Sequence, residues 1–313
     1  MNEITKKDSN PDINLLINAI CKKEAILVLG PDLMFNFDNA LLKEFSKFLE
    51  EQEIVHNFND DEELFSSKTQ FDGEVFLYRH NFFESQKPGE LHLKIAQIPF
   101  HAIILLSPDL LLKNAFEKQS FQYDFKFYHK GKQQEEIKLY PTEKVPMLYN
   151  LLGNFEAPDS MVLCFDHLFD YLISIFGKYE LPAIIRDVLK KGQTIFFLGF
   201  KYERWYFKLI MRLIDLENKM RRQASSKEVE GMNGVVNFYS NEFQFKFIRD
   251  LTGNEIVDRI HKYFSDNSML RSVALPNSNL APNDGNSIGI TGNGNIGLQG
   301  VTAETITINI SKP

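Results

Sequence analysis

The turn at Gly199 and Phe200 could bring a ligand to the end of a buried strand. It directly follows the apolar run 195–198, and a helical pattern begins a few residues later at Trp205. In a doubly wound parallel sheet such a turn lies at the carboxyl edge, where ligands usually bind. Gly199 and Phe200 are therefore candidates for a ligand site, although a well-packed strand–helix unit without a ligand fits the same residues.

A second turn of this kind contains Gly30, Pro31 and Asp32 and follows the apolar run 25–29. A strand, a glycine turn and a helix in this order open many nucleotide-binding folds, in which backbone N–H groups surround a phosphate. Here the turn has a single glycine, Pro31 has no N–H group, and Asp32 places a negative charge where a pyrophosphate would lie. These residue types predict a poor phosphate site.

The elements that position these turns can be read from hydrophobic periodicity. Strands are predicted at 25–29, 101–106, 121–128, 161–164, 195–198 and 235–239. Helices are predicted at 12–23, 39–51, 91–95, 110–117, 167–177, 182–191, 205–222 and 255–264, and residues 51–83 look acidic and mostly irregular. This alternation predicts an α/β fold with a mainly parallel sheet and flanking helices.

The predicted helix 205–222 has a repeating apolar face. Trp205, Leu209 and Leu213 recur at spacings of four residues, so we expect this face, with the Trp205 ring, to pack inward. Gly199 is expected to permit a close backbone turn before the helix. The basic pair at Arg221 and Arg222 is interpreted as a solvated helix end.

Charge and composition argue against several classes of function. The 313 residues carry a net charge of −7 and no basic block, so binding to nucleic acid or to an anionic membrane is not expected. The N-terminus lacks an apolar signal core, and no apolar run is long enough to span a membrane. Cys21 and Cys164 lie among apolar residues without metal-ligand spacing, which predicts buried thiols and no metal site. We expect a soluble, cytoplasmic protein.

The composition changes sharply after residue 265. Residues 266–286 are rich in Asn, Ser, Pro and Gly and are predicted to be a flexible linker. Residues 287–313 alternate apolar with polar or glycine positions, which favours strands and cross-β stacking. The residues expected to mediate self-association are Asn295, Ile296, Leu298, Gln299, Val301, Ile306 and Ile308. The alternative is a hairpin that docks on the sheet of the domain formed by residues 1–265.

Several segments together resemble the sirtuin-like domains of bacterial anti-phage defence proteins. These segments are VLGPD, HAIILLSPD, YNLLGN with MVLCFDHLFDYL, and FLGFKYERWYFKLI. The resemblance covers roughly residues 13–265, and the last segment carries most of it. It implies a Rossmann-like fold, and active members of the family hydrolyse NAD. They share a glycine-rich first turn, a Thr-x-Asn-x-Asp strand end and a His-Gly pair.

This sequence departs from the family pattern at each catalytic point. Pro31 and Asp32 replace small residues, Ser107 stands where Asn is expected, and Leu152 stands where His precedes Gly. Leucine can neither accept a proton nor orient a ribose hydroxyl. If the chain were active, the candidate catalytic residues would be Ser107, Asp109, His101 and Asn150. The residues expected around a bound NAD or ADP-ribose are Gly30, Asp32, Ser107, Asp109, Gly153, Asn154, Gly199 and Phe200.

The resemblance and the departures together favour a non-catalytic sirtuin-like sensor, scaffold or adaptor in a bacterial immunity system, with no required cofactor. GNGNIGLQGV with TITINI resembles the amyloid signalling motifs of some bacterial immune proteins, so the tail would connect the chain to itself or to a partner immune protein. Two alternatives remain. One is an NAD-hydrolysing effector with unusual residues, and the other is a receptor that binds NAD or ADP-ribose without cleaving it.

Overall fold

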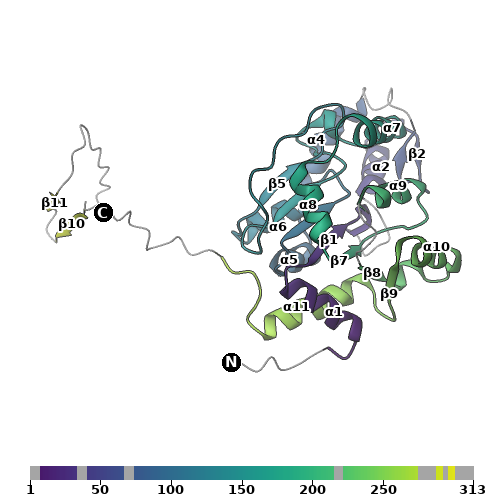
Figure 1. The fold of residues 1–313 in the computed structure, drawn as a ribbon. Coiled ribbons are helices and arrows are strands. Elements are labelled where there is room, and N and C mark those ends of the chain that lie inside the picture. The colour runs from purple at the N-terminus through teal and green to yellow at the C-terminus, as the bar shows by residue number, and fades with distance from the viewer. Residues whose placement is uncertain are drawn as a thin grey trace. The chain divides into compact units, whose positions relative to one another are not determined.

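The structure is a computed structural model that describes residues 8–33, 41–66, 74–214, 221–273, 287–291 and 295–299 (Figure 1). The chain divides into two units, Met1–Val273 and Ala274–Pro313, and each is described by itself. The first unit holds the sheet and the helices that carry the candidate site. In the second, the described residues form two strands.

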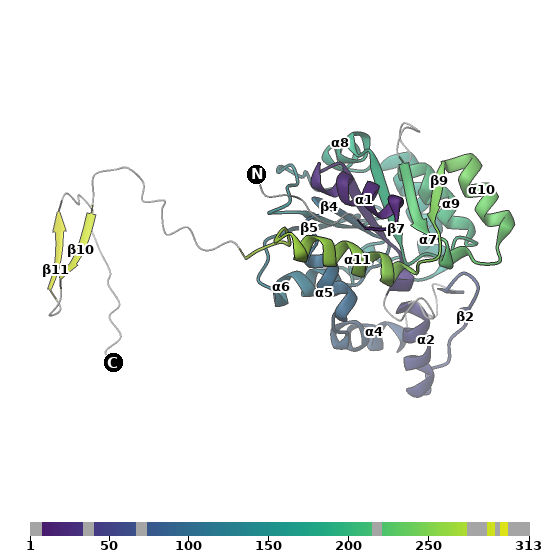
Figure 2. The ribbon, with the colours of Figure 1, turned by 90° about the horizontal axis from the view of Figure 1, so that it is seen from below.

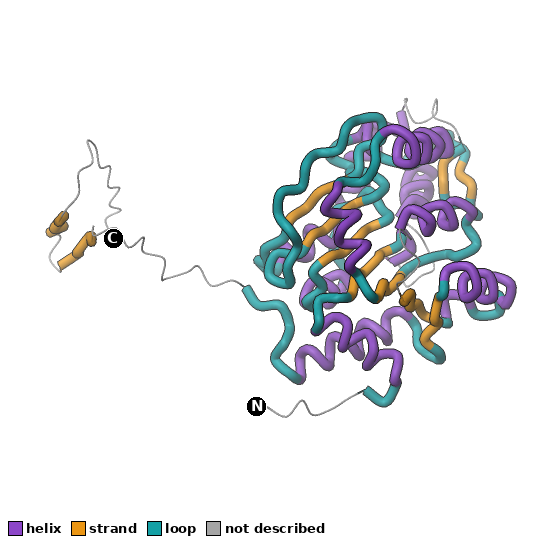
Figure 3. Tube along the Cα trace, in the orientation of Figure 1, coloured by secondary structure: helices purple, strands orange, loops and turns teal. Residues whose placement is uncertain are grey.

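The first unit is built on a seven-stranded sheet that lies among helices (Figure 3). The strand order is β5-β6-β4-β1-β7-β8-β9, and every pairing in it is parallel. The strands are β1 (Ala25–Leu29), β4 (Ala102–Leu105), β5 (Asp124–Phe127), β6 (Met147–Asn150), β7 (Thr194–Leu198), β8 (Arg221–Ser225) and β9 (Phe245–Ile248). Every residue of β1 and β7 is buried, as expected for central strands that are covered on both faces. The predicted α/β fold with a Rossmann-like parallel sheet is confirmed.

Helices cover both faces of this sheet. Alternate β1 residues face opposite layers, since Ile26 and Val28 belong to one apolar core and Leu27 and Leu29 to the other. The second core is formed with α1 (Pro11–Cys21), α5 (Glu90–Gln97), α6 (Leu111–Lys118) and α11 (Gly253–Asp266), and Figure 2 shows α11 running beside α1 and α5. The first core is formed with α2 (Leu41–Glu51), α4 (Glu74–Ser85), α7 (Phe165–Ile173), α8 (Ala183–Lys191), α9 (Trp205–Ile214) and α10 (Asn233–Phe243).

Short elements connect the sheet to these helices near the carboxyl edge. Three-residue 3₁₀ turns lie at Pro31–Leu33, Pro158–Ser160 and Lys227–Val229. The strands β2 (Phe58–Asn59) and β3 (Leu64–Phe65) form a small antiparallel pair. A π-helical turn, Ser174–Lys178, continues directly from α7.

The sequence prediction was wrong for two elements in the second half of the unit. The predicted strand 235–239 lies inside the helix α10, and the predicted helix 205–222 is helical only to Ile214 among the described residues, with β8 beginning at Arg221. Arg222, interpreted as part of a solvated helix end, is fully buried and donates from Nη1 to the Phe243 carbonyl at 2.5 Å. The strands β6, β8 and β9 were not predicted.

Three further predictions need correction. The region 51–83, expected to be irregular, contains β2, β3 and most of α4. Residues 161–164 form no regular strand, but Cys164 makes a single bridge to Phe65. Cys164 is buried as predicted, whereas Cys21 is exposed at the end of α1.

The buried face of α9 also differs from the predicted one. Its most buried side chains are Phe207, Ile210, Met211 and Ile214. Leu209 is 39% exposed, and Trp205 is half-buried, with its ring stacked on that of Phe169 at 6.0 Å between centroids. The helix is turned relative to the prediction because a run of apolar residues at 205–207 allows more than one inward face.

The first unit continues past the predicted boundary at residue 265. The helix α11 ends at Asp266, and Arg271 is buried near the amino end of β4. Its guanidinium donates hydrogen bonds to the carbonyls of Ala96, Ile98, Phe100 and Glu143. Residues 266–273 therefore belong to the first unit and are held to it by Arg271, although most of them are exposed, and residues 274–286 lie outside the described residues.

The described part of the tail forms a hairpin. β10 (Ser287–Thr291) pairs antiparallel with β11 (Asn295–Gln299), so that Ile288 lies opposite Leu298 and Ile290 opposite Ile296. Of the residues expected to self-associate, Val301, Ile306 and Ile308 lie outside the described residues. Self-association itself remains a prediction.

Candidate functional site

The strand order reverses direction between β1 and β7, which makes this point the topological switch of the sheet. The chain leaves β1 for β4 on one side and later returns to β7 on the other. In open parallel sheets, ligands bind in the crevice outside the carboxyl ends of the strands at such a point. We call this place the switch point, and define it by the turns after β1 and β7.

The sheet brings most of the predicted residues to one edge. They follow the carboxyl ends of the four neighbouring strands β6, β4, β1 and β7, where Asn150, Ser107, Gly30 and Gly199 lie. His101 is separate from them, because it precedes β4 and lies at the amino edge. Burial lowers the pKa of His101, and Glu143 and Lys23 are its charged neighbours. His101 therefore cannot act together with the other candidates.

The two glycines of the switch point are packed against each other. A Cβ atom on Gly30 would lie 1.9 Å from the Gly199 carbonyl oxygen. Gly199 has φ of +81°, and a Cβ atom there would lie 2.9 Å from the Leu33 backbone nitrogen. The predicted close turn at Gly199 is confirmed, and its partner is the backbone of the other turn rather than a ligand.

The turn after β1 has few N–H groups to offer a phosphate. Gly30 N–H donates to the Leu198 carbonyl at 2.8 Å, and Asp32 N–H donates to the Gly199 carbonyl at 3.2 Å. Pro31, between them, has no N–H. A phosphate site needs several free backbone donors pointing at the anion, and these three positions supply none.

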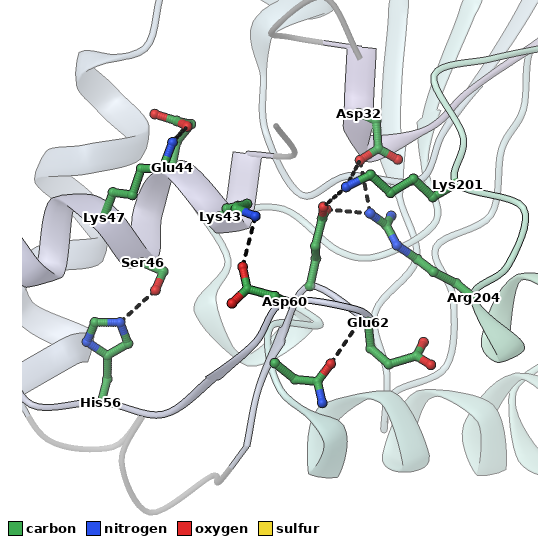
Figure 4. Close-up of polar contacts among 12 residues, drawn as sticks. Asp32, Lys43, Glu44, Ser46, Lys47, His56, Asp60, Glu62, Lys201 and Arg204 are labelled. Atoms are coloured by element: carbon green, nitrogen blue, oxygen red, sulfur yellow. Dashed lines mark hydrogen bonds and ion pairs between the residues drawn. The ribbon is translucent and has the colours of Figure 1, made fainter. Parts of the chain in front are cut away.

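Four charged side chains fill the space beside this turn. Arg204 donates to Asp32 at 2.9 Å, and Lys201 lies 4.0 Å from the same carboxylate (Figure 4). Both cations also form ion pairs with Glu63. Asp32, Glu63 and Arg204 are each at most 3% exposed, whereas Lys201 is about one third exposed. We call these residues the ion cluster; its formal charges balance.

The ion cluster changes the interpretation of the negative charge on Asp32. The sequence suggested a negative charge that would repel a pyrophosphate, but the structure pairs this carboxylate with Arg204 and Lys201. Burial is the largest influence on Asp32 and raises its pKa to about 6, although Arg204 acts in the opposite direction. Sequence reasoning missed Glu63, Lys201 and Arg204, and the KYER segment directly after Gly199-Phe200 was the signal that could have found the two cations.

A further carboxyl group, Glu228, lies on the other side of Gly199. The Gly199 N–H donates to its Oε1 at 3.4 Å, and its Oε2 atom is closed off from solvent. Burial, with a smaller contribution from the nearby Asp32 carboxylate, raises the pKa of Glu228 to about 8. Glu228 is therefore largely protonated at neutral pH, so it adds little negative charge to the switch point.

The polar residues after β4 and β6 are engaged in structural hydrogen bonds. The Ser107 hydroxyl donates to Asp109, whose other carboxylate oxygen accepts from the Leu111 N–H at 2.8 Å at the start of α6. The Asn150 amide donates to the Asp109 carbonyl at 2.8 Å. These bonds fix the turn that begins α6, as capping carboxylates do. They hold the Ser107 and Asp109 side chains in the turn, so these side chains are not oriented toward a substrate.

The turn after β6 is also held by its own backbone. Gly153 has φ of +92°, and a Cβ atom there would lie 2.3 Å from the Ser160 carbonyl oxygen. The Asn154 side chain accepts from the Glu156 N–H at 3.1 Å, which closes a tight local turn. Gly153 and Asn154 therefore shape the chain between β6 and α7.

The cavity that remains at this edge is small and mostly apolar. It has a volume of about 20 Å³ and is lined by Leu106, Ser107, Leu152, Arg204 and other side chains. This volume is close to the space that a single water molecule needs. Leu152, which stands where the family has a histidine, is 8% exposed and forms part of the wall.

The described residues contain neither a candidate metal site nor a helix that could cross a membrane. No three His, Cys, Asp or Glu side chains in that part of the chain are grouped so that they could hold a metal ion. None of its helices is both long enough and apolar enough to cross a membrane.

Part of the first unit is similar to known proteins. Residues 103–228, which run from β4 to the turn after β8, match a family model described as the SIR2-like domain. A solved structure described as "Structural Basis for the Mechanism and Regulation of Sir2 Enzymes" aligns with 82% of this chain and 98% of its own chain, at 10% sequence identity and a TM-score of 0.39. A search among curated proteins found no match. The family match supports a sirtuin-like domain in this chain.

Proposed function

We propose that this chain is a non-catalytic sirtuin-like sensor, scaffold or adaptor of a bacterial anti-phage immunity system, coupled to a partner or to further copies through its tail. One observation carries the non-catalytic part. The ion cluster of Asp32, Glu63, Lys201 and Arg204 occupies the switch point where a dinucleotide would have to lie. A ligand could enter there only by separating buried ion pairs, which is costly because it leaves charges uncompensated.

The polar groups at the carboxyl edge also support a chain without catalytic activity. Ser107 and Asp109 hold the start of α6, and Leu152 presents only carbon atoms to the cavity. Cleavage of the bond between nicotinamide and ribose needs a group that positions the ribose and a water molecule. Among the described residues at this edge, the Asn150 Oδ1 atom has no hydrogen-bond partner, but this side chain is fully buried and its amide nitrogen is held by the Asp109 carbonyl.

The first test is an assay for nicotinamide release from NAD with the purified full chain. We expect no release above a protein-free blank. Steady release that is lost in Ser107→Ala, and kept in the matched control Ser66→Ala at an exposed site, would instead establish the hydrolase alternative. The SIR2-like match over residues 103–228 is the observation that keeps an NAD-related function as this alternative.

Calorimetric titration with NAD and ADP-ribose addresses the receptor alternative. Binding at the switch point requires the ion cluster to open, so it should strengthen in Glu63→Ala if it occurs there at all. Tight binding to the wild-type chain without nicotinamide release would favour a receptor that holds the nucleotide intact.

The proposed coupling through the tail is tested by deletion. The described strands β10 and β11 pair with each other in register, and an isolated two-stranded hairpin is only marginally stable in water. Additional copies can supply further pairing, so we expect the full chain to form concentration-dependent assemblies in sedimentation and a chain without residues 287–313 to stay monomeric. Gln299→Lys should weaken assembly, because stacked copies would place like charges about 4.8 Å apart. Unchanged assembly after deletion would remove the tail from the proposal.

A further inference from the structure

A second cavity of the first unit is far larger than the one at the switch point. It has a volume of about 530 Å³, which lies within the range of about 300–1,000 Å³ that is typical of small-molecule sites. Its walls are α4, the segment after β5, the loop before α7, and α7 with its π-helical turn. We call it the α7 cavity.

Basic side chains predominate around the α7 cavity. Arg79, Lys130, Lys132 and Lys178 line it together with two carboxylates, Asp159 and Asp170, and two histidines, His129 and His167. Arg79 is only 6% exposed, so its guanidinium is held at the wall rather than extended into solvent. Lys130 is fixed by hydrogen bonds of 2.6 Å to the carbonyls of Asp159 and Met161. The excess of cations is unusual in a chain of net charge −7 and favours an anionic ligand.

The other part of the wall is apolar or aromatic. Leu163, Ile173 and Tyr179 line the same cavity, and Ile173 is 72% exposed although it is a large aliphatic residue. Charged and apolar side chains around one cavity are the usual composition of a site that binds an organic molecule rather than a bare ion.

The backbone of this wall is irregular and held in place. The α-helix α7 changes at Ser174 into a π-helical turn, a rare geometry that occurs frequently at functional sites. The Ser174 hydroxyl accepts from the Gly131 N–H at 3.1 Å and lies 3.0 Å from the Tyr128 hydroxyl. These contacts fix the segment with Lys132 against the turn with Lys178, so the two lysines are presented from a rigid frame.

We propose that the α7 cavity binds a small organic phosphate with a planar or apolar portion, of the size and charge of a nucleoside monophosphate. Guanidinium and ammonium groups are the side chains that recognise phosphate in proteins. The phosphate lies toward Arg79, Lys132 and Lys178, and the organic portion lies against Ile173 and Tyr179. This site is separate from the switch point and does not depend on whether the chain cleaves NAD.

The test is calorimetric titration of the full chain with AMP, with adenosine and inorganic phosphate as the two half-ligands. We expect saturable binding of AMP that is at least about tenfold tighter than that of either half-ligand, since each lacks one of the two sets of contacts. Nicotinamide release is measured on the same sample, which keeps the result for this cavity separate from the proposed lack of catalysis.

Two pairs of variants localise the site. Lys132→Ala with Lys178→Ala removes two exposed charges from the cavity and should weaken AMP binding at least about tenfold. The matched control, Lys191→Ala with Lys262→Ala, removes the same net charge from other exposed helix positions and should change affinity less than about twofold. Ile173→Glu should weaken AMP binding more than Ile173→Gln, which has the same size, because both remove apolar surface but only the glutamate repels the phosphate.

Several results would overturn the proposal. One is the absence of saturable AMP binding to the wild-type chain. A second is an equal loss of affinity in the two lysine pairs, which would indicate attraction to overall charge. A third is adenosine binding as tightly as AMP, which would exclude phosphate recognition. Inorganic phosphate binding as tightly as AMP would exclude a role for the apolar wall.

Discussion

The switch point and the α7 cavity are both near the carboxyl edge of one sheet, but they treat charge in opposite ways. At the switch point two carboxylates and two cations neutralise one another beside a cavity of about 20 Å³ that Glu63 and Arg204 help to line. In the α7 cavity, cations outnumber carboxylates among the lining residues, and the volume is about 530 Å³. The switch point, where the fold could place a nucleotide, is thus stabilised by its own ion pairs. The cavity with an excess of positive charge lies elsewhere.

The contrast between the switch point and the α7 cavity shows that strand order alone does not determine where a ligand site lies. The strand order predicts a crevice between β1 and β7, yet side chains from the 3₁₀ turn Pro31–Leu33, the β2–β3 segment and the β7–α9 turn meet there instead. A site needs both the crevice and free hydrogen-bonding groups that point into it. If this comparison is right, the residues at the switch point stabilise the fold, and changes to them should lower the free energy of unfolding.

The largest effect is expected from the removal of Arg204. Arg204→Ala leaves Asp32 and Glu63 buried with only Lys201 as a partner, so the free energy of unfolding should fall by about 3–5 kcal/mol. Arg212→Ala, at an exposed position of the helix α9 that follows Arg204, should cost less than about 1 kcal/mol. Both are measured by urea denaturation at neutral pH. A triple change, Asp32→Leu with Glu63→Leu and Arg204→Met, should recover most of the loss, and equal costs for the two arginines would show that the ion cluster is not structural.

The second effect concerns pH and Glu228. Burial raises the pKa of this carboxyl in the folded chain to about 8, whereas its usual value is 4.5. The folded state therefore holds the proton more tightly than the unfolded state, and stability falls as pH rises from about 4.5 to about 8. The loss should be on the order of a few kcal/mol. Glu228→Gln should remove this slope, and a wild-type stability that is flat between pH 6 and 8 would contradict the assignment.

The third effect compares one glycine from each region. Gly199 at the switch point and Gly131 at the α7 cavity have nearly the same φ, +81° and +82°. A Cβ atom on Gly199 would lie 2.9 Å from the Leu33 nitrogen, whereas one on Gly131 would meet no atom within 4 Å. Gly131→Ala should cost about 1–2 kcal/mol for the left-handed backbone alone. Gly199→Ala should cost at least about 1 kcal/mol more in denaturation experiments. Equal costs would mean that the switch point is not tightly packed.

The sequence predicted the centre of the sheet better than its margin. The runs at β1, β4 and β7 are continuous and apolar, and such runs have few other structures available to them. In contrast β8 begins with Arg221 and Arg222, and its burial depends on a hydrogen bond from Arg222 to a carbonyl in α10 that no local pattern reveals. Residues 235–239 were predicted as a strand because Val, Phe and Tyr favour strands, but tertiary packing made them a helix.

The candidate site shows the same limit. The sequence correctly placed the turns after β1, β4 and β7 at strand ends, because each of them follows an apolar run, whereas the strand β6 was not predicted. It could not show that Arg204 reaches Asp32, since 172 positions separate them in the chain, or that Glu63 joins them from a segment that looks irregular. Charges that pair across the fold leave no periodic signature, and their partners become visible only when the sheet brings them together.

The clasp formed by Arg271 has a mechanical consequence. Its guanidinium holds carbonyls of the segment that leads into β4, a central strand of the sheet, and its own N–H donates to the Gln97 carbonyl at 2.7 Å. A pulling force applied to the chain beyond Val273 therefore acts on the hydrogen bonds of Arg271 before it acts on α11. The load passes in shear to the amino end of β4, so the first unit can resist tension without unwinding its last helix.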